Sequence, residues 1–396
     1  MTDLNGTPIA QRCHISFFGC TNAGKSSLIN AIANQNVSVV SDVKGTTTDP
    51  VKKTMEILPI GAVVLFDTAG FDDTSELGKL RIEKTNEILS KTDIAILVVD
   101  SSVGLKEKDN ELIELFKKKN TPYLIVYNKS DLHKKDNLAE NEIYVSSKTQ
   151  ENIDRLKEKI ANFASSNKTE KFIITDKLSP KDTVILVIPI DEAAPKGRII
   201  LPQQNTLREL LDFRCKVICC QDSELKETLN DLKNKPKLVI TDSQVFGKIK
   251  DIVPDNIYFT SFSILFARYK GSLKTLVEGA KTLENLKDGD NILISEGCTH
   301  KRQCNDIGSV KLPNWIKKYT GKNLNFEFTS GGSFPSDLAK YALIVHCGGC
   351  MLNEKEMQNR IQSATEQRQN IVNYGVLIAY MNGILSRSLE IFPEIM

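Results

Sequence analysis

Eight residues near the amino terminus have the types and spacing of a phosphate-binding loop. Residues 19–26 read Gly-Cys-Thr-Asn-Ala-Gly-Lys-Ser, after a short apolar run and before an amphipathic helical stretch. Gly19 and Gly24 allow the backbone to curl so that its N–H groups face a phosphate. Lys25 can place its charge between the β- and γ-phosphates, and Ser26 can offer its hydroxyl to Mg²⁺. These residues predict a nucleoside triphosphate site.

Three further motifs predict which base is bound. Asp67-Thr-Ala-Gly70, Asn128-Lys-Ser-Asp131 and Ser146-Ser-Lys148 each follow an apolar run that reads as a strand. The carboxyl ends of parallel strands are where ligands bind in open α/β sheets. Asp131 can accept two hydrogen bonds from the N1–H and the exocyclic amine of guanine, a pair that adenine cannot supply. The four motifs in this order indicate a GTPase domain.

The same motifs assign roles to single residues. The carboxylate of Asp67 is expected to reach Mg²⁺ through water and Gly70 to sense the γ-phosphate, so both join Lys25 as candidate catalytic residues. Phe71 stands where Ras-like proteins carry a glutamine that orients water, and an apolar side chain cannot do so. We therefore expect slow intrinsic turnover unless a cation, another residue or dimerisation compensates. The predicted nucleotide-binding residues are Asn22, Ala23, Gly24, Lys25, Ser26, Ser27, Asn128, Lys129, Asp131, Ser146, Ser147 and Lys148.

The amino-terminal part resembles a known branch of GTPases. Residues 21–27, together with Gly45-Thr-Thr-Thr-Asp49, are similar to the Era/TrmE branch of bacterial GTPases. The resemblance implies that Thr47 is the switch threonine, which would bind Mg²⁺ together with Ser26. It also implies that Asn22 marks hydrolysis stimulated by K⁺.

Composition limits the classes of protein to which the chain can belong. The 396 residues carry a net charge of +2, which gives no general case for binding nucleic acid or membrane. No apolar run approaches the roughly 20 residues of a membrane span, and the polar amino terminus does not read as a signal peptide. We therefore expect a cytoplasmic protein. Its nine cysteines are then expected to be reduced thiols or metal ligands rather than disulfides.

The order of apolar runs predicts an α/β protein with a P-loop GTPase domain, built on a doubly wound sheet, followed by two smaller α/β domains. The expected domains are residues 1–167 for the GTPase, 172–268 for a middle domain and 269–396 for a last domain. Strands are expected at 14–18, 62–66, 94–99, 123–127, 143–145, 184–188, 216–219, 237–240, 256–260, 291–294 and 341–345, and late helices at 353–362 and 371–385.

A second group of reactive residues lies in the last domain. Cys298-Thr-His300 follows the predicted strand at 291–294, and His346-Cys-Gly-Gly-Cys350 follows the one at 341–345. Both groups lie just past the end of a strand, so one sheet can bring them together. The two glycines between Cys347 and Cys350 can relieve the tight loop and let two thiolates point at one metal.

Residue types alone leave the bound group open. Zinc would take four ligands, for example the thiolates of Cys298, Cys347 and Cys350 and one histidine. Three thiolates with an open fourth position would suit a [4Fe–4S] cluster instead. A third possibility is a redox-sensing GTPase in which Cys347 and Cys350 form a dithiol; its function should survive loss of Cys298.

Over its full length the chain resembles the HydF family of [FeFe]-hydrogenase maturation GTPases. The resemblance rests on the GTPase motifs, the C-x-H and H-C-x-x-C groups in order, and the loop Pro195-Lys-Gly-Arg198. It implies a homodimer joined through the middle domain, with a [4Fe–4S] cluster bound by Cys298, Cys347 and Cys350. It further implies a scaffold and carrier for a transient diiron cluster precursor of the hydrogenase active site.

The family's partners are two radical-SAM maturases and apo-[FeFe]-hydrogenase, and its cofactors would be GTP, Mg²⁺, K⁺ and the cluster. The fourth cluster ligand could be His300, His346, a carboxylate such as Asp191, or an exogenous group. The rival prediction is an RNA-modification or ribosome-assembly GTPase with a carboxyl-terminal zinc site. The neutral charge balance and the absence of a basic stretch interleaved with aromatic residues count against that rival.

Overall fold

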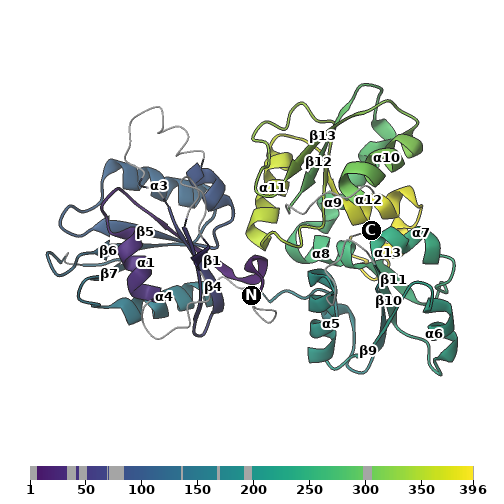
Figure 1. Ribbon diagram of the computed structural model, residues 1–396, viewed down its shortest axis with the longest axis horizontal. Helices are drawn as coiled ribbons and strands as arrows, with labels where there is room; N and C mark the ends of the chain where they lie inside the picture. Colours follow the sequence, from purple (N-terminus) through teal and green to yellow (C-terminus); the bar gives the residue numbers. More distant parts are fainter. Residues whose placement is uncertain are drawn as a thin grey trace. The chain divides into compact units, whose positions relative to one another are not determined.

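The computed structural model shows two compact units, Met1–Thr169 and Glu170–Met396 (Figure 1). It describes residues 7–33, 42–43, 51–68, 70, 84–134, 137–166, 170–190, 199–297 and 306–395. Each unit is built mainly on parallel β-sheet.

The first unit contains a seven-stranded sheet in the order β2-β3-β4-β1-β5-β6-β7. Only the β2–β3 and β3–β4 pairs are antiparallel. The strands are β1 (Cys13–Phe18), β2 (Asp42–Val43), β3 (Val51–Ile57), β4 (Gly61–Asp67), β5 (Ile94–Asp100), β6 (Tyr123–Asn128) and β7 (Glu142–Tyr144). The helices are α1 (Lys25–Ala33), one over 84–90, α3 (Glu107–Lys118) and α4 (Ile153–Ser166).

Both faces of this sheet are covered, and the strand sequences show why. Along β1, Ile15 and Phe17 belong to one hydrophobic core, while Phe18 belongs to the core on the other face. Along β5 the same alternation recurs, because successive side chains of a strand point to opposite faces. A strand that is buried on both faces must be apolar along its whole length. The apolar strands β1 and β5 therefore fit the predicted doubly wound sheet.

The second unit contains two four-stranded parallel sheets. The first sheet and its helices are β8 (Thr183–Val187), α5 (Leu201–Asp212), β9 (Lys216–Cys220), α6 (Leu225–Asp231), β10 (Leu238–Thr241), α7 (Phe246–Ile249), β11 (Tyr258–Ser261), α8 (Phe262–Lys270) and α9 (Leu273–Ala280). The second set is β12 (Asn291–Glu296), α10 (Leu312–Thr320), β13 (Asn325–Ser330), β14 (Leu343–His346), α11 (Glu354–Glu366), β15 (Ile371–Asn373), α12 (Tyr374–Met381) and α13 (Leu385–Leu389).

The two halves of the second unit repeat one topology. The sheet orders are β11-β10-β8-β9 and β13-β12-β14-β15, so in both the first strand lies between the second and the third, and the fourth lies beyond the third. The helix after each first strand begins with Leu-Pro, at Leu201 in α5 and Leu312 in α10. The helix after each fourth strand is capped in the same way: Ser261 accepts from the N–H of Ile264, and Asn373 accepts from the N–H of Val376. We call these halves the first and the second repeat.

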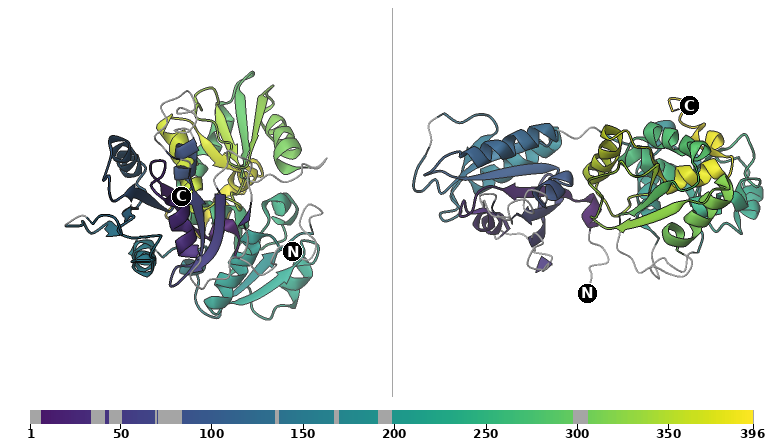
Figure 2. Two further views of the ribbon diagram at one scale, coloured as in Figure 1. Left: turned by 60° about the vertical axis from the view of Figure 1, so that its left-hand side comes forward. Right: turned by 90° about the horizontal axis from the view of Figure 1, so that it is seen from above.

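The two repeats pack reciprocally. Helix α9 of the first repeat contacts β15 of the second, α13 of the second contacts β11 of the first, and α8 contacts α12. Figures 1 and 2 show the teal strands of the first repeat and the green strands of the second on opposite sides of these helices. One hydrophobic core includes strand residues from both sheets, for example Ile185 and Ile294. The repeats therefore form one packed body.

The α/β class and the GTPase sheet confirm the fold predicted from the sequence, and every predicted strand is present within two residues at each end. Strands β2, β3 and β13 were not predicted. The predicted helix over 371–385 is wrong at both ends. Ile371–Asn373 form strand β15, helix α12 runs from Tyr374 to Met381, and a separate helix, α13, begins at Leu385. The three-domain division stays a prediction. Among the described residues, no helix has the length and apolar character needed to span a lipid bilayer.

Candidate functional site

The phosphate-binding loop lies between β1 and α1 and requires glycine at two positions. Gly19 has φ +137°, and a Cβ there would lie 2.2 Å from the carbonyl oxygen of Val98. Gly24 has φ +92°, and its Cβ would lie 2.3 Å from the side-chain amide of Asn128. Both backbone conformations are disfavoured for other residues, so the sequence pattern and the packing agree.

The side chain of Lys25 lies inside this loop and binds its backbone. Its side chain is buried, and Nζ donates to the carbonyl oxygens of Gly19 and Cys20, at 2.9 Å in each case. The ammonium group is therefore already placed at the centre of the loop. A bound phosphate would meet it without a large movement of the side chain.

Ser26, one of the two predicted Mg²⁺ ligands, lies next to Asp67, which is expected to reach the metal through water. The Ser26 hydroxyl donates to Asp67 Oδ2 at 2.5 Å, which connects the start of α1 with the end of β4. The other oxygen, Asp67 Oδ1, is buried and has no hydrogen-bond partner among the described residues. A hydroxyl beside a carboxylate with an unpaired oxygen fits Mg²⁺ and its water ligands. Thr47 lies outside the described residues, and Gly70 is described without its two neighbours.

Asn128 connects the base-binding loops to the phosphate loop. Its Nδ2 donates to the carbonyl oxygens of Ala23 (3.2 Å) and Gly24 (3.4 Å), while its Oδ1 accepts from the N–H of Ser147 (3.1 Å). Lys129 forms an ion pair with Asp100 at 2.6 Å. Although burial opposes ionisation of Asp100, hydrogen bonds from Lys129 and Ser102 lower its pKa overall.

Asp131 is held as a carboxylate next to this loop. The hydroxyl of Ser146 donates to Asp131 Oδ1 at 2.7 Å, and this hydrogen bond is the main reason why the pKa of Asp131 is lowered. Lys148 adds a smaller favourable charge. The structure thus brings together the predicted base-binding residues from the ends of β6 and β7, with an anionic acceptor as guanine recognition requires. Ser27 is exposed at the start of α1.

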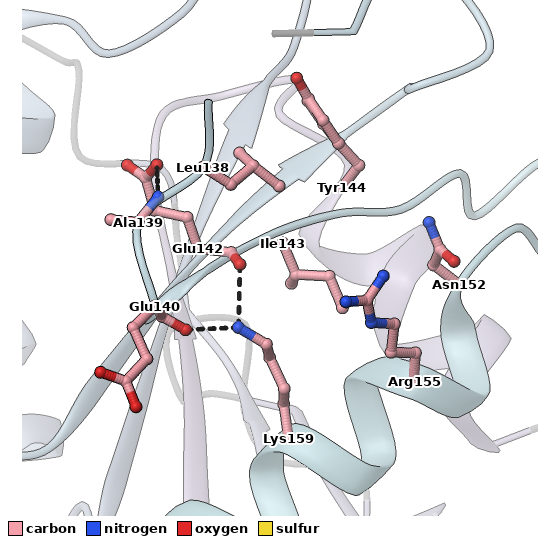
Figure 3. A pocket seen from close by; sticks show the side chains of 9 residues that line it. All are labelled: Leu138, Ala139, Glu140, Glu142, Ile143, Tyr144, Asn152, Arg155 and Lys159. Carbon is pink, nitrogen blue, oxygen red and sulfur yellow. Dashed lines mark hydrogen bonds between the residues drawn. The ribbon is translucent and has the colours of Figure 1, made fainter. Parts of the chain in front are cut away.

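A cavity of about 290 Å³ lies elsewhere in the GTPase unit, between β7 and α4 (Figure 3). Lys159 crosses it and donates to the carbonyl oxygens of Glu140 and Glu142, the latter at 3.0 Å. Burial, together with the nearby charge of Arg155, lowers the pKa of Lys159. None of the predicted nucleotide-binding residues lines this cavity, so it is distinct from the nucleotide site.

In the second repeat, the Cys347–Cys350 loop follows β14 directly. Strands β12 and β14 are parallel neighbours with Ser295 opposite His346, so the residues after both strands emerge at one edge. The N–H of Cys347 donates to the carbonyl oxygen of Ser295 at 2.9 Å. Its Sγ accepts from the N–H groups of Gly297 (3.1 Å) and Gly349 (3.4 Å). The chain leading to Cys298 therefore already contacts one of the two described thiols.

Both described thiols of the loop are partly buried. Burial raises the pKa of the Cys347 thiol to about 11 and, more moderately, that of Cys350. The two N–H donors on Cys347 Sγ oppose this increase, since they stabilise the thiolate. A cation at this position would displace the protons. Among the described residues no group of three His, Cys, Asp or Glu side chains converges as a metal site, and Cys298 and His300 lie outside them.

Family models match three consecutive segments of the chain. A 50S ribosome-binding GTPase model matches residues 14–129. A hydrogen maturase F dimerization domain matches 173–271 and a hydrogen maturase F tetramerization domain matches 274–391, together more than half of the chain. The chain belongs to the hydrogen maturase F family. This confirms the HydF resemblance, and the boundary between the two matched domains falls near the end of α8.

Two curated relatives align with less than half of this chain. The chain is 33% identical over 170 residues to the tRNA modification GTPase MnmE of Streptococcus agalactiae, covering 42% of this chain and 36% of the relative. For MnmE of Mesomycoplasma hyopneumoniae the identity is 37% over 174 residues, covering 43% and 38%. The chain thus spans little more than a third of these relatives.

Two solved structures are also similar. The G domain of the T. maritima FeoB iron transporter is 27% identical with a TM-score of 0.30, over 39% of this chain and 99% of that one. An Era variant of Aquifex aeolicus bound to GDP and aluminium fluoride is 16% identical with a TM-score of 0.31, over 80% and 93%.

His346 is buried beside the thiol loop, and both of its ring nitrogens are within hydrogen-bond distance of a neighbour. Nδ1 lies 2.7 Å from the carbonyl oxygen of Cys347, so Nδ1 carries the proton. Nε2 lies 3.0 Å from Nη1 of Arg360, so Nε2 accepts. Burial, and then the charge of Arg360, lower the pKa of His346 to about 3, which keeps the ring neutral.

Arg360 and Lys270 are two functional candidates that sequence reasoning missed. Arg360 is buried on α11 and also donates to the carbonyl oxygen of Gly331 and to Glu356, each at 2.7 Å. Lys270 is the last residue of α8, and burial lowers its pKa to about 8. Neither cation belongs to a motif. In the sequence, Lys270 could have been recognised as a lysine at the end of a strongly apolar helix.

Proposed function

We propose that this chain is a GTP-hydrolysing maturation factor that binds a [4Fe–4S] cluster and carries a diiron precursor to apo-[FeFe]-hydrogenase. The observation that carries the proposal is the thiol loop of a hydrogen maturase F chain. Cys347 and Cys350 follow β14, and the backbone that leads to Cys298 donates a hydrogen bond to Cys347 Sγ. Such N–H donors stabilise a metal-bound thiolate.

Hydrolysis would use the GTPase residues described above. Lys25 would hold the β- and γ-phosphates, Ser26 and Thr47 would bind Mg²⁺, and Asp67 would hold a water on the metal. With Phe71 in the position that follows Gly70, turnover would be slow, and K⁺ at Asn22 would stimulate it. Nucleotide exchange would then act as a switch on partner affinity.

The cluster would be bound by Cys298, Cys347 and Cys350. When bound, it supplies an iron that three protein thiolates leave open to a further ligand. His346 is a poor candidate for that position, because its Nδ1–H donates to a carbonyl and its Nε2 accepts from Arg360. The proposal therefore keeps His300, Asp191 or an exogenous group as the fourth ligand.

The dimerization and tetramerization domains matched in this chain support self-association, which we place in the middle domain for the dimer. The proposed partners are radical-SAM maturases and apo-hydrogenase, in the cytoplasm, without membrane or nucleic acid.

The test of this function is metal analysis of protein purified without oxygen. We expect about four irons and four sulfides per chain, with an EPR signal after reduction. Both iron and sulfide should fall sharply in Cys298→Ser. One zinc per chain with no sulfide would contradict the proposal and support a GTPase with a zinc site.

A second variant separates the two activities. Lys25→Ala should abolish GTP hydrolysis, because the buried ammonium in the phosphate loop is lost. It should leave iron and sulfide unchanged, because the thiols lie in the other compact unit. Phosphate release and iron content are measured on the same preparation. Loss of iron together with hydrolysis would show that the nucleotide site is needed for cluster retention.

A further inference from the structure

Lys270 reaches from the first repeat into the thiol loop of the second. It is only 5% exposed, although lysine is rarely buried. Its Nζ donates to the carbonyl oxygens of Gly349 (3.0 Å), Cys350 (3.3 Å) and Leu352 (2.7 Å). The residue belongs to the matched dimerization domain, whereas all three acceptors belong to the matched tetramerization domain.

The geometry of these contacts identifies the charged form of the side chain. Three carbonyl acceptors require three hydrogens, and only the ammonium form of lysine supplies them. A buried charge is tolerated only when its hydrogen-bonding capacity is satisfied, as it is here. The carbonyls of an irregular loop are thus fixed by one cation, which lies beside both Cys347 and Cys350.

Comparison of the repeats shows that a cation at this helix position occurs only on the thiol side. The residue equivalent to Lys270, counted from the capped start of each helix, is Asn382 just beyond α12. Asn382 is neutral, and its Nδ2 donates to the carbonyl oxygen of Ile378 in its own helix at 2.8 Å. The loop after the third strand of the first repeat begins with Asp242 and contains no thiol. The cation and the thiols therefore occur together.

We propose that Lys270 is a positioning residue for the cluster, which fixes the Cys347–Cys350 loop in its metal-binding shape and places a positive charge beside the thiolates. This inference rests on the proposed cluster function. A fixed cation next to a cluster stabilises its reduced, more negative state, because net charge and hydrogen bonding set the potential of iron–sulfur clusters. The matched dimerization domain thereby contributes a positioning residue to a metal site whose three cysteine ligands lie in the matched tetramerization domain.

The experiment compares variants of the full chain purified without oxygen. Lys270→Met should lose at least half of its iron and sulfide, and the remaining cluster should have a more negative midpoint potential in a dithionite titration followed by EPR. Lys270→Arg, which keeps the charge and the donors, should recover most of both. The matched control is Lys274→Met, which removes one exposed charge on α9 and should change neither.

A second readout does not need the cluster. In metal-free protein, the rate at which Cys350 is alkylated, measured by mass spectrometry, should rise about tenfold in Lys270→Met. That factor corresponds to losing one charged hydrogen bond that keeps the loop closed. The exposed thiol of Cys219 is the internal standard and should react at an unchanged rate.

The outcomes separate this inference from the proposed function. Absence of iron and sulfide from the unmodified chain would overturn the cluster, while the alkylation rates would still report on the loop. A normal cluster in the unmodified chain, with unchanged content, potential and alkylation in Lys270→Met, would overturn the role of Lys270. If Lys270→Met does not fold by circular dichroism, Lys270→Gln decides by the same criteria, since it keeps donors but no charge.

Discussion

The two repeats of residues 170–396 share one topology but differ in chemistry at the ends of their strands. After β10, the carboxylate of Asp242 forms a local hydrogen bond with the backbone: it accepts from the N–H of Gln244, two residues later, at 3.2 Å. After β14, the equivalent residue Cys347 instead receives N–H groups from Gly297 and Gly349. The same sheet edge therefore completes a turn in one repeat and presents a thiol in the other. Function resides in the loops, and the repeated scaffold only positions them.

The difference extends to the segments that cross between the repeats. Lys270 and Arg387 each send a cation into a loop of the opposite repeat, and each donates to three carbonyl oxygens. Lys270 reaches the loop directly after β14, whereas Arg387 reaches the segment between α7 and β11. Only Lys270 reaches a loop that contains thiols. We infer that this reciprocal anchoring belongs to the fold and that the cluster site makes use of one side of it.

The largest expected effect comes from replacing Cys347, the residue that directly follows the third strand of the second repeat. Cys347→Ser should reduce iron to a small fraction of the unmodified level, because a serine hydroxyl is a poor substitute for a thiolate ligand. Asp242→Ser, at the matching place in the first repeat, keeps a capping side chain and should leave iron unchanged. Iron and sulfide are measured on protein purified without oxygen. Equal losses in the two variants would show that iron content reports on general folding rather than on ligation.

The phosphate loop, the base-binding loops and the thiol loop could be predicted because each is a short motif whose residues are close in sequence. Lys270 could not, since it is 79 residues from Gly349 and the contact depends on the packing of two repeats. The repeat itself was not predicted either. Its shared signals are limited to a Leu-Pro pair and a capping residue, whereas topology is visible only in the sheet order.

Two misjudged strands have local causes. Ile371–Asn373 form β15, although their apolar character continues into α12 and so reads as one helix. Strand β13 is an edge strand with exposed positions, and it lacks the continuous apolar run that marks a central parallel strand.

An intermediate effect is expected where α8 and α12 meet. A Cβ on Gly375 would lie 2.3 Å from Cβ of Ser263, the residue that occupies the equivalent position in the first repeat. Gly375→Ala should therefore lower the free energy of unfolding by about 3 kcal/mol, at the upper end for overpacking. Denaturant unfolding of the metal-free chain, followed through the second unit, measures the change.

A matched double variant should rescue this loss by moving the small residue to the other side of the contact. Adding Ser263→Gly to Gly375→Ala should restore most of the lost stability, because the small and the larger residue then occupy opposite sides of the same contact. Ser263→Gly alone should cost about 1 kcal/mol or less. Additive losses in the double variant would mean that the two positions do not share a contact, and that the reciprocal packing of the repeats is not as inferred.

The smallest effect should come from Arg387, which anchors the loop without thiols. Its guanidinium donates to the carbonyl oxygens of Lys250 (2.9 Å), Val253 (2.6 Å) and Pro254 (3.0 Å). Arg387→Met should cost about 1.5 kcal/mol of stability, since charged hydrogen bonds are lost while the apolar stem is kept. Iron content and cluster potential should not change, because this loop holds no ligand. A fall in iron as large as that expected for Lys270→Met would mean that any loosening between the repeats releases the cluster, and that Lys270 acts through general packing rather than through its own loop.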